Sequence, residues 1–244
     1  MITFRPLTET DFSAFAADYN TTRLSALCRG YGMCPALLDT WALETKNGPA
    51  ALIGRFAGEM TLCVNDRFSD SEAEETAAFL RFMAHPLQGS ASAVSMLGFS
   101  SQRKATVYQK PCGVTATSLS PVKEGFSSLY DRLALGTDGD IRLGQKDDWV
   151  ADVSHRVRHG VASAFVTENG AALVGFLTDR AAVLSGIVIP PDRRGQGEGT
   201  RLLSAVAGAV SPRTLFAATE TAAPFYEQNG FEAVDTQSFV TQFI

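Results

Sequence analysis

The chain has 244 residues, of which 45% are hydrophobic and 19% are charged, and these fractions are typical of a globular protein with a buried core. They exclude a disordered or collagen-like chain. Twenty-one Lys and Arg against 26 Asp and Glu leave a net charge of −5, with no block rich in Lys or Arg, so we expect no nucleic-acid partner. The most apolar stretch, residues 181–189, is far shorter than the roughly 20 residues of a membrane span, so we expect no membrane association.

The first half of the chain alternates predicted strands with predicted helices. Residues 71–74, Ser-Glu-Ala-Glu, form a predicted capping box, in which a hydroxyl and a carboxylate satisfy the free amides of a first helical turn. The helix that it opens ends at His85, before Pro86. We predict strands at 2–4, 39–44, 50–56, 59–64 and 91–97, and helices at 11–20, 24–30 and 71–85.

The second half repeats this order of elements. Apolar residues at helical spacing mark one helix around Trp149 and Val153 and another around Leu202 and Val206. A further helix at 222–229 is stopped by Gly230. We predict strands at 161–167, 171–178, 181–189 and 214–219, and closing strands within 231–244.

A short internal repeat supports this parallel. Residues 45–54 match residues 167–175 once Pro49 is deleted, and both contain an Asn-Gly turn between apolar runs. The turn at 47–48 recurs at 169–170, which is 122 residues later and half the chain length of 244. Residues 111–125, with their Pro, Gly, Ser and Thr, form the natural boundary, so we predict two α+β halves of similar plan.

The cysteines and the amino-terminal residues indicate a reducing compartment. Residues 1–11 mix charged residues with apolar ones and lack the apolar core of a signal peptide. The cysteines have no CxxC spacing and no histidine at zinc spacing. We therefore expect free buried thiols and a cytoplasmic protein. The four cysteines are Cys28, Cys34, Cys63 and Cys112.

One pair of histidines has the spacing of a possible metal site. His155 and His159 stand four residues apart on a predicted helix, which could present two ligands on one face. Arg156 and Arg158 surround them, and no acidic third ligand is nearby. We therefore interpret this segment as a solvated polar face and expect no metal.

The sharpest signal is a glycine-rich segment between a predicted strand and a predicted helix. Residues 189–200 read IPPDRRGQGEGT, with three glycines at alternate positions that let the backbone turn tightly and approach a ligand. The first amides of the following helix have no internal partner, and the helix dipole adds positive potential there. Loop and helix start together form a predicted phosphate site, to which Arg193 or Arg194 could add charge.

Two common phosphate motifs do not fit this segment. The dinucleotide fingerprint needs G-x-G-x-x-G, and here the third glycine comes too early. The nucleoside-triphosphate loop needs Lys and then Ser or Thr after its last glycine, whereas Gly199 is followed by Thr200 and Arg201. A glycine-rich turn that only joins strand to helix stays open as the alternative.

The residues around this segment resemble a known family. Arg194-x-x-Gly197-x-Gly199, after a proline and before two leucines, resembles the pyrophosphate-binding motif of the GNAT superfamily of acetyl-CoA-dependent N-acetyltransferases. Residues 222–231, AAPFYEQNGF, resemble the family's next motif, a helix that ends in Tyr-x-x-x-Gly-Phe. Residues 4–12 are similar to its usual first strand and helix start, and the strong motifs cover about residues 161–244.

The resemblance implies an α+β fold of the three-layer α/β type, with tandem GNAT-like domains that each contain a mixed, mostly antiparallel sheet flanked by helices. We predict a degenerate GNAT-like domain without a phosphate loop at 1–120 and a GNAT acetyltransferase domain with the acetyl-CoA site at 121–244. In the first half, residues 65–70, NDRFSD, replace the glycine loop and add acidic charge. We therefore expect no coenzyme A there.

The resemblance also implies roles for individual residues. The backbone of Ile187, Val188 and Ile189 would pair with the pantetheine arm, and Tyr226 would be the general acid, since a phenol of pKa about 10 can protonate a thiolate of pKa about 8.5. A packed aromatic at a helix end is the alternative for Tyr226. The general base stays open among Asp179, Glu220 and water. The remaining predicted cofactor-binding residues are Arg194, Gly195, Gln196, Gly197, Glu198, Gly199, Thr200 and Thr219, the last where the family often has Asn.

The function implied by the resemblance is transfer of an acetyl group from acetyl-CoA to a primary amine of an unidentified small acceptor. The alternatives are a non-catalytic coenzyme A-binding or sensor protein, and a structural module in which both halves are degenerate. We expect a monomer that imitates a dimer of single domains, or a homodimer.

Overall fold

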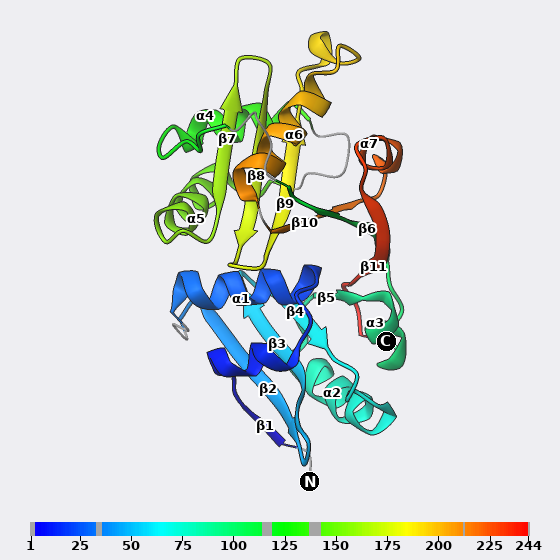
Figure 1. Cartoon of the computed structure of the whole chain (residues 1–244). Helices are drawn as coiled ribbons and strands as arrows, with labels where there is room; N and C mark the ends of the chain where they lie inside the picture. Colours follow the sequence, from blue (N-terminus) through cyan, green and yellow to red (C-terminus); the bar gives the residue numbers. More distant parts are fainter. Residues whose placement is uncertain (1–2, 33–35, 114–118, 137–142, 212, 244) are drawn as a thin grey trace. The chain divides into compact units, whose positions relative to one another are not determined.

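The computed structural model describes residues 3–32, 36–113, 119–136, 143–211 and 213–243. It divides into two compact units, unit 1 with Met1–Thr106 and Asp235–Ile244, and unit 2 with Val107–Val234. The boundaries fall inside two strands, β6 (Arg103–Pro111) and β11 (Glu232–Val240), so each of these strands contributes residues to both units (Figure 1). Whether 1–120 and 121–244 are two copies of one domain stays a prediction, because compactness and descent from a repeat are different properties.

Unit 1 contains a mixed sheet in the order β1-β2-β3-β4-β5-β11. The first four strands pair antiparallel, β5 lies parallel to β4, and residues 237–240 of β11 pair antiparallel with β5. Its elements are β1 (Thr3–Pro6), η1 (Glu9–Ala14), α1 (Tyr19–Tyr31), β2 (Leu38–Thr45), β3 (Gly48–Phe56), β4 (Glu59–Val64), α2 (Asp70–Met83), β5 (Leu87–Ser90) and α3 (Ala91–Met96).

Several predictions for unit 1 are wrong. In place of the predicted helices at 11–20 and 24–30, the structure has the short 3-10 helix η1 and the single helix α1. Residues 91–96 form the helix α3 and not a strand, because the Ser90 hydroxyl accepts a hydrogen bond from Ala93 N at 3.2 Å and caps a helix. A short apolar run cannot by itself distinguish a buried strand from a buried helix. The capping box of α2 consists of Ser69 and Glu72, two residues earlier than predicted.

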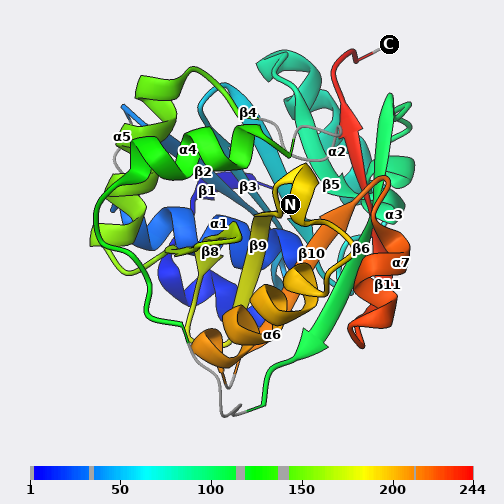
Figure 2. The ribbon, with the colours of Figure 1, turned by 90° about the horizontal axis from the view of Figure 1, so that it is seen from above.

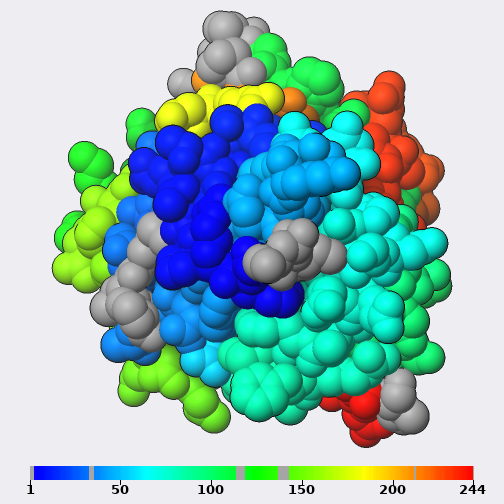
Figure 3. Space-filling view, turned by 90° about the horizontal axis from the view of Figure 1, so that it is seen from below, coloured from blue at the N-terminus to red at the C-terminus, as the bar shows by residue number. Residues whose placement is uncertain are grey.

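One core cluster of unit 1, besides the buried face of α1, lies between its sheet and the helices α2 and α3. Leu62 and Leu80 are almost fully buried there, and Phe99 packs edge-to-face on Phe243 with ring centroids 5.0 Å apart. Figure 3 views this unit from below, where the red carboxy-terminal residues emerge beside the blue-green segment. The last residues of the chain therefore belong to the core of the first unit.

Unit 2 contains a sheet in the order β6-β10-β9-β8-β7. Strands β7, β8 and β9 pair antiparallel, and β10 lies parallel to β9. The predicted α+β class, with a mostly antiparallel sheet flanked by helices, is confirmed. The elements of unit 2 are α4 (Phe126–Ala134), α5 (Lys146–Arg158), β7 (Ser163–Thr167), β8 (Gly170–Leu177), β9 (Ala181–Val188), η2 (Pro191–Arg193), α6 (Glu198–Val210), β10 (Thr214–Thr219) and α7 (Ala223–Gln228).

Helices cover both faces of the unit 2 sheet. Figure 2 shows α4 and α5 on one side of β8 and β9, with α6 on the other side. Leu173 of β8 packs with α4 and α5, whereas its neighbours Ala172 and Val174 pack with α6. This alternation follows from the two-residue period of a strand and gives the unit three layers.

The two Asn-Gly turns form matching hairpins. Thr45 pairs with Gly48 at the end of β2 and β3, and Thr167 pairs with Gly170 at the end of β7 and β8. In each hairpin the threonine hydroxyl donates to the glycine carbonyl, at 2.8 Å in the first and 3.2 Å in the second. The repeat seen in the sequence is therefore also a repeat of local structure.

Cys28, Cys63 and Cys112 are free and buried, and Cys34 lies outside the described residues. Within the described ranges, no three His, Cys, Asp or Glu side chains gather as metal ligands, and His155 and His159 stack with ring centroids 4.1 Å apart. No helix in the described part of the chain is long and apolar enough to cross a membrane. The predicted solvated face around the histidines is wrong at Arg156, which is buried.

Candidate functional site

A cavity of about 550 Å³ lies in unit 2, among the ends of β9 and β10, the glycine-rich segment and α7. All of its lining residues belong to this unit. The predicted cofactor-binding residues all line it except Gln196, whose side-chain amide donates instead to the Asp192 carbonyl at 3.2 Å. Tyr226 lines it as well. The structure therefore gathers the residues of both sequence motifs around one space.

Two parallel strands separate at this cavity. Residues 181–184 of β9 pair with residues 214–217 of β10, and the register of pairing ends there. Beyond that point Ile187 and Thr219, one from each strand, both line the cavity. Backbone amides and carbonyls on the facing edges of separated strands are available to a ligand, because backbone polar groups require partners.

The amino terminus of α6 opens into the same cavity. Gly197 is its N-cap with φ 77°, and no side chain caps the helix. The first helical bond runs from Arg201 N to the Gly197 carbonyl, so the amides of residues 198–200 precede the intrahelical bonds. Gly199 lies against α7, since a Cβ there would stand 3.1 Å from the Phe225 ring. Uncapped amides and the helix dipole give this end a positive potential that favours an anion.

The charges near this helix end are partly paired with one another. Arg201 binds the Glu198 carboxylate at 2.7 Å, and Asn169, at the tip of the β7–β8 hairpin, donates to the same carboxylate at 3.1 Å. These bonds, the Arg201 bond first, lower the pKa of Glu198. Arg194 donates from Nε to the Ile189 carbonyl at 3.2 Å. The hairpin tip is thus tied to the first turn of α6.

Tyr226 is held by aromatic packing on α7. It is buried, its ring stacks on Tyr108 with centroids 5.8 Å apart, and Phe231 packs edge-on at 5.4 Å. The Tyr108 hydroxyl donates to Glu227 at 3.0 Å, and burial together with this bond raises the pKa of Tyr108. Packing fixes the Tyr226 ring at the edge of the cavity, as the alternative of a packed aromatic expects, and the general-acid role stays a prediction.

Thr219 has a structural role at the start of α7. Its hydroxyl oxygen accepts hydrogen bonds from Thr221 N at 3.2 Å and Ala222 N at 2.8 Å. A side-chain oxygen that accepts amides two and three residues ahead fixes a turn. Thr219 therefore sets the direction of the chain from β10 into the helix that carries Tyr226.

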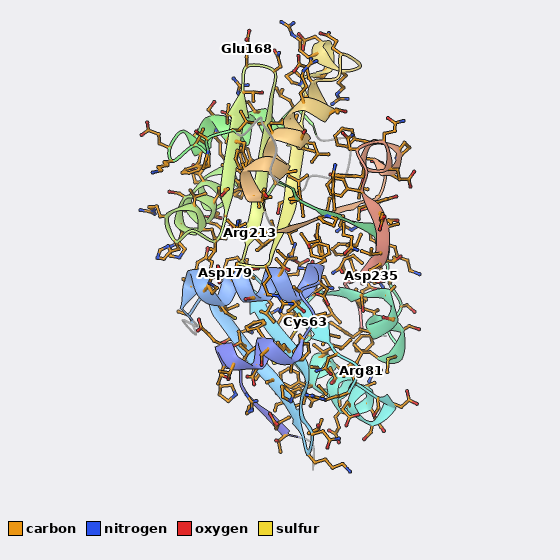
Figure 4. All side chains as sticks on the ribbon, in the orientation of Figure 1. Cys63, Arg81, Glu168, Asp179, Arg213 and Asp235 are labelled. Carbon is orange, nitrogen blue, oxygen red and sulfur yellow. The ribbon has the colours of Figure 1, made fainter. Side chains whose placement is uncertain are left out.

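The two acidic candidates for the general base do not line the cavity. Asp179 lies in the turn between β8 and β9, at the opposite end of β8 from Glu168 in the hairpin tip (Figure 4). Glu220 is exposed directly after β10. Water stays as the third candidate.

Several residues of the cavity were missed by the sequence reasoning. Ser185, Phe225 and Gly136 line it, although the sequence analysis assigned no role to any of them; Phe225 lies within the second motif segment, and the other two lie outside both motifs. Ser185 has a detectable signal, because it is the polar residue in the middle of an apolar strand. Gly136 has none, because it reaches the cavity from the distant helix α4 through tertiary packing.

Comparison with known proteins gives a family for one part of the chain. Residues 147–244 match the family described as the acetyltransferase (GNAT) domain. No curated protein matches the chain.

Solved structures with the same fold cover nearly the whole chain. A tandem GNAT protein from the clavulanic acid biosynthesis pathway is 13% identical with a TM-score of 0.56, and the match covers 98% of this chain and 97% of that one. A GNAT-family acetyltransferase from Colwellia psychrerythraea is 11% identical with a TM-score of 0.55 and coverage of 98% and 100%. A Pyrococcus horikoshii protein that is described as an acetyltransferase is 13% identical with a TM-score of 0.53, and the match covers 98% of this chain and 88% of that one.

Proposed function

Because residues 147–244 are a GNAT acetyltransferase domain, we propose that the protein transfers the acetyl group of acetyl-CoA to a primary amine of a small acceptor. The observation that carries the proposal is one cavity that joins the uncapped amino terminus of α6 to the separated ends of β9 and β10. An anion and an extended amide-bearing chain would each find matching groups there. Pyrophosphate and pantetheine have this chemistry.

Acetyl-CoA would be held mainly by backbone groups. The amides of residues 195–200 would bind the pyrophosphate, with Arg194 adding positive charge. The backbone of Ile187, Val188 and Ile189 would pair with the pantetheine arm. The positive φ angles of Gly195 and Gly197, 75° and 77°, support this arrangement, since they expose the backbone without a side chain.

The acetyl thioester supplies the group to be transferred. In the reaction the amine nitrogen bonds to the acetyl carbon, the carbon–sulfur bond breaks, and the amine loses one proton. Tyr226 would give its phenolic proton to the departing thiolate, and a water or an acidic side chain would take the proton of the amine. A strand amide of β9 near the thioester oxygen would stabilise developing negative charge.

The alternative is a non-catalytic protein that binds or senses coenzyme A. The same helix terminus and separated strands support it, whereas Tyr226 at the edge of the cavity favours catalysis. Nucleic acid is not an expected partner at a net charge of −5. A cytoplasmic location and a monomer or homodimer complete the proposal.

The test combines calorimetry with a thiol-release assay. Acetyl-CoA is titrated into the full chain, and free thiol is then followed with a panel of amino acids, polyamines, aminoglycosides and peptide amino termini. Binding together with amine-dependent thiol release supports the transferase. Binding without release for any amine supports the sensor, and no binding rejects both.

The stoichiometry of binding tests the predicted difference between the halves. If only the second half holds acetyl-CoA, calorimetry gives one molecule per chain. Two molecules per chain would reject the degenerate first copy.

A further inference from the structure

Arg156 is a buried cation on a helix behind the cavity wall. It lies on α5 with 7% of its surface exposed, among residues that face the sheet. Charged side chains are rarely buried unless they are paired and hydrogen-bonded. Two partners meet this need, the Asp152 carboxylate one turn earlier and the Gly175 carbonyl of β8, which accepts from Arg156 Nη1 at 2.6 Å.

The Gly175 carbonyl belongs to an irregular place in the sheet. Along β8 and β9, Leu173 pairs with Gly186, Val174 with Leu184, and Phe176 with Val183. The register therefore shifts twice, and both Gly175 and Ser185 are left without a register partner. A bulge of this kind disrupts the ladder and re-aims a side chain, and its freed backbone groups need other partners. Arg156 supplies one of them.

Glycine is required at the bulge by close packing. A Cβ at Gly175 would stand 2.2 Å from Ser185 Oγ and 3.5 Å from Arg156 Nη1. The Ser185 side chain therefore occupies the space beside Gly175, and the guanidinium lies close to the same point. Arg156, Gly175 and Ser185 form one packed group, which we call the bulge brace.

The bulge brace is continuous with the cavity. Ser185 is exposed between buried neighbours on β9, and both Ser185 and Gly186 line the cavity. Ser185 follows Leu184, the last β9 residue that pairs with β10, so the bulge coincides with the separation of the two strands. The position of this β9 segment decides where its amides point.

We propose that Arg156 is a positioning residue of the acyl-transfer site, which fixes the β8–β9 bulge and thereby directs Ser185 and the following β9 backbone into the cavity. The proposal rests on the proposed function for its kinetic consequence. Arg156 does not line the cavity and touches no reacting atom. Its loss therefore changes the geometry of the thioester end and leaves the pyrophosphate end, residues 194–200, in place.

The test compares Arg156→Gln and Arg156→Lys with a matched control on the same helix. Lysine keeps the charge but cannot form the two-sided contact of the planar guanidinium fork. Arg158→Gln is the control, because Arg158 is exposed and, among the described residues, its side chain donates to the Ser154 carbonyl of its own helix. Each protein is checked by thermal unfolding, titrated with acetyl-CoA, and assayed for thiol release with the amine that the wild type uses fastest.

We expect kcat to fall by about ten-fold to a hundred-fold in Arg156→Gln and by less in Arg156→Lys, since misplacement by about 1 Å can cost this much. The Kd of acetyl-CoA should change by less than about three-fold, and Arg158→Gln should match the wild type. If Arg156→Gln does not fold, Arg156→Lys decides. A folded variant with wild-type kcat overturns the proposal.

Hydrogen exchange keeps the proposal testable if the wild type neither binds acetyl-CoA nor releases thiol, an outcome that rejects the proposed function. The amides of residues 174–176 and 184–187 should exchange faster in Arg156→Lys than in the wild type and in Arg158→Gln. Unchanged exchange in these two segments overturns the bulge brace independently of any activity.

Discussion

The helices α2 and α6 occupy the same place in the element order of the two units, yet their amino termini are satisfied in opposite ways. At α2 the Ser69 hydroxyl and amide bond the Glu72 carboxylate, and Asp70 adds a second negative charge in the first turn. At α6 the N-cap is Gly197, which has no side chain, and the helix end faces a cavity. At α2 the Glu72 carboxylate caps the helix end, whereas at α6 the first-turn carboxylate of Glu198 is paired with Arg201 and Asn169, and no side chain caps the first amides.

The segments around these two helices differ in the same sense. Before α2, the Asn65 side chain donates to the Ala14 and Pro49 carbonyls at 3.1 and 2.9 Å and ties the segment to its own unit. After the next strand, the fourth residue of α3 is the buried Val94, where the fourth residue of α7 is Tyr226. Unit 1 thus buries or caps positions whose counterparts in unit 2 line a cavity.

We expect the largest effect on folding and on acetyl-CoA binding when the two units are separated. A fragment of residues 121–244 lacks Val107–Pro111, the part of β6 in unit 2 with Tyr108 against Tyr226, and keeps residues 237–240 without β5. We expect the fragment to aggregate and to bind no acetyl-CoA, as measured by size-exclusion chromatography and calorimetry beside the full chain. A monodisperse fragment with full affinity would show that unit 2 folds without the rest.

Tyr226→Phe tests whether Tyr226, the fourth residue of α7, has a chemical role that Val94 at the same place in α3 lacks. The ring keeps its packing on Tyr108 and Phe231, while the transferable proton is lost. We expect turnover to fall by about 10²–10⁴, the usual contribution of a general acid, with little change in acetyl-CoA affinity. Steady-state thiol release and calorimetry measure the two quantities. Unchanged turnover at every pH would remove Tyr226 from the acid role.

Gly197→Val tests the uncapped end of α6. Valine is strained at φ 77° and would cover amides that now face the cavity, so we expect acetyl-CoA affinity to fall at least about ten-fold. Gly125→Val is the matched control, because Gly125 is the N-cap of α4 with φ 78° and open space around it. Both variants lose some thermal stability, but only the first should lose affinity in calorimetry. Equal affinity in a folded Gly197→Val would contradict the proposed anion site.

Glu72→Ala tests the closed end of α2 and has the smallest effect. Removing the carboxylate should lower the free energy of unfolding at pH 7 by about 0.5–1 kcal/mol, as for other helix caps, and should create no acetyl-CoA site because the glycine segment is absent. The Ser69 bond lowers the pKa of Glu72, so its stabilisation exists above the unfolded-state pKa of about 4.3.

The stabilisation by the Glu72 carboxylate is lost as the pH falls through its lowered folded-state pKa. In urea unfolding, the difference between Glu72→Ala and the wild type should therefore be smaller at pH 3 than at pH 7. Glu75→Ala, at an exposed position of the same helix, is the control and should match the wild type at both values. A difference that is as large at pH 3 as at pH 7 would contradict the role of the charge.

Local patterns predicted much of unit 2 and of its cavity. The strand at 214–219 has the predicted bounds, and the residues of the two motifs line one cavity, because glycine spacing and helix starts are encoded locally. Arg156 was misread, since charged neighbours suggested a solvated face. Its spacing of seven and three residues from Trp149 and Val153 places it on their side of the helix, but one of the two partners that explain its burial, the β8 carbonyl, is distant in sequence. The sequence also did not predict that β6 and β11 each contribute residues to both units, because strand partners distant in sequence leave no local signal.

Because β11 pairs with β5 in unit 1, β5 is synthesised long before its neighbouring strand. Ser90 of β5 has Gln237 as its register partner, and the ribosome makes that partner about 150 residues later. At about 5–20 residues per second, the edge of β5 waits roughly 7–30 s for its strand. An unpaired strand edge is a template for pairing with other chains, so the nascent first unit passes through an interval in which the edge of β5 is open to such pairing.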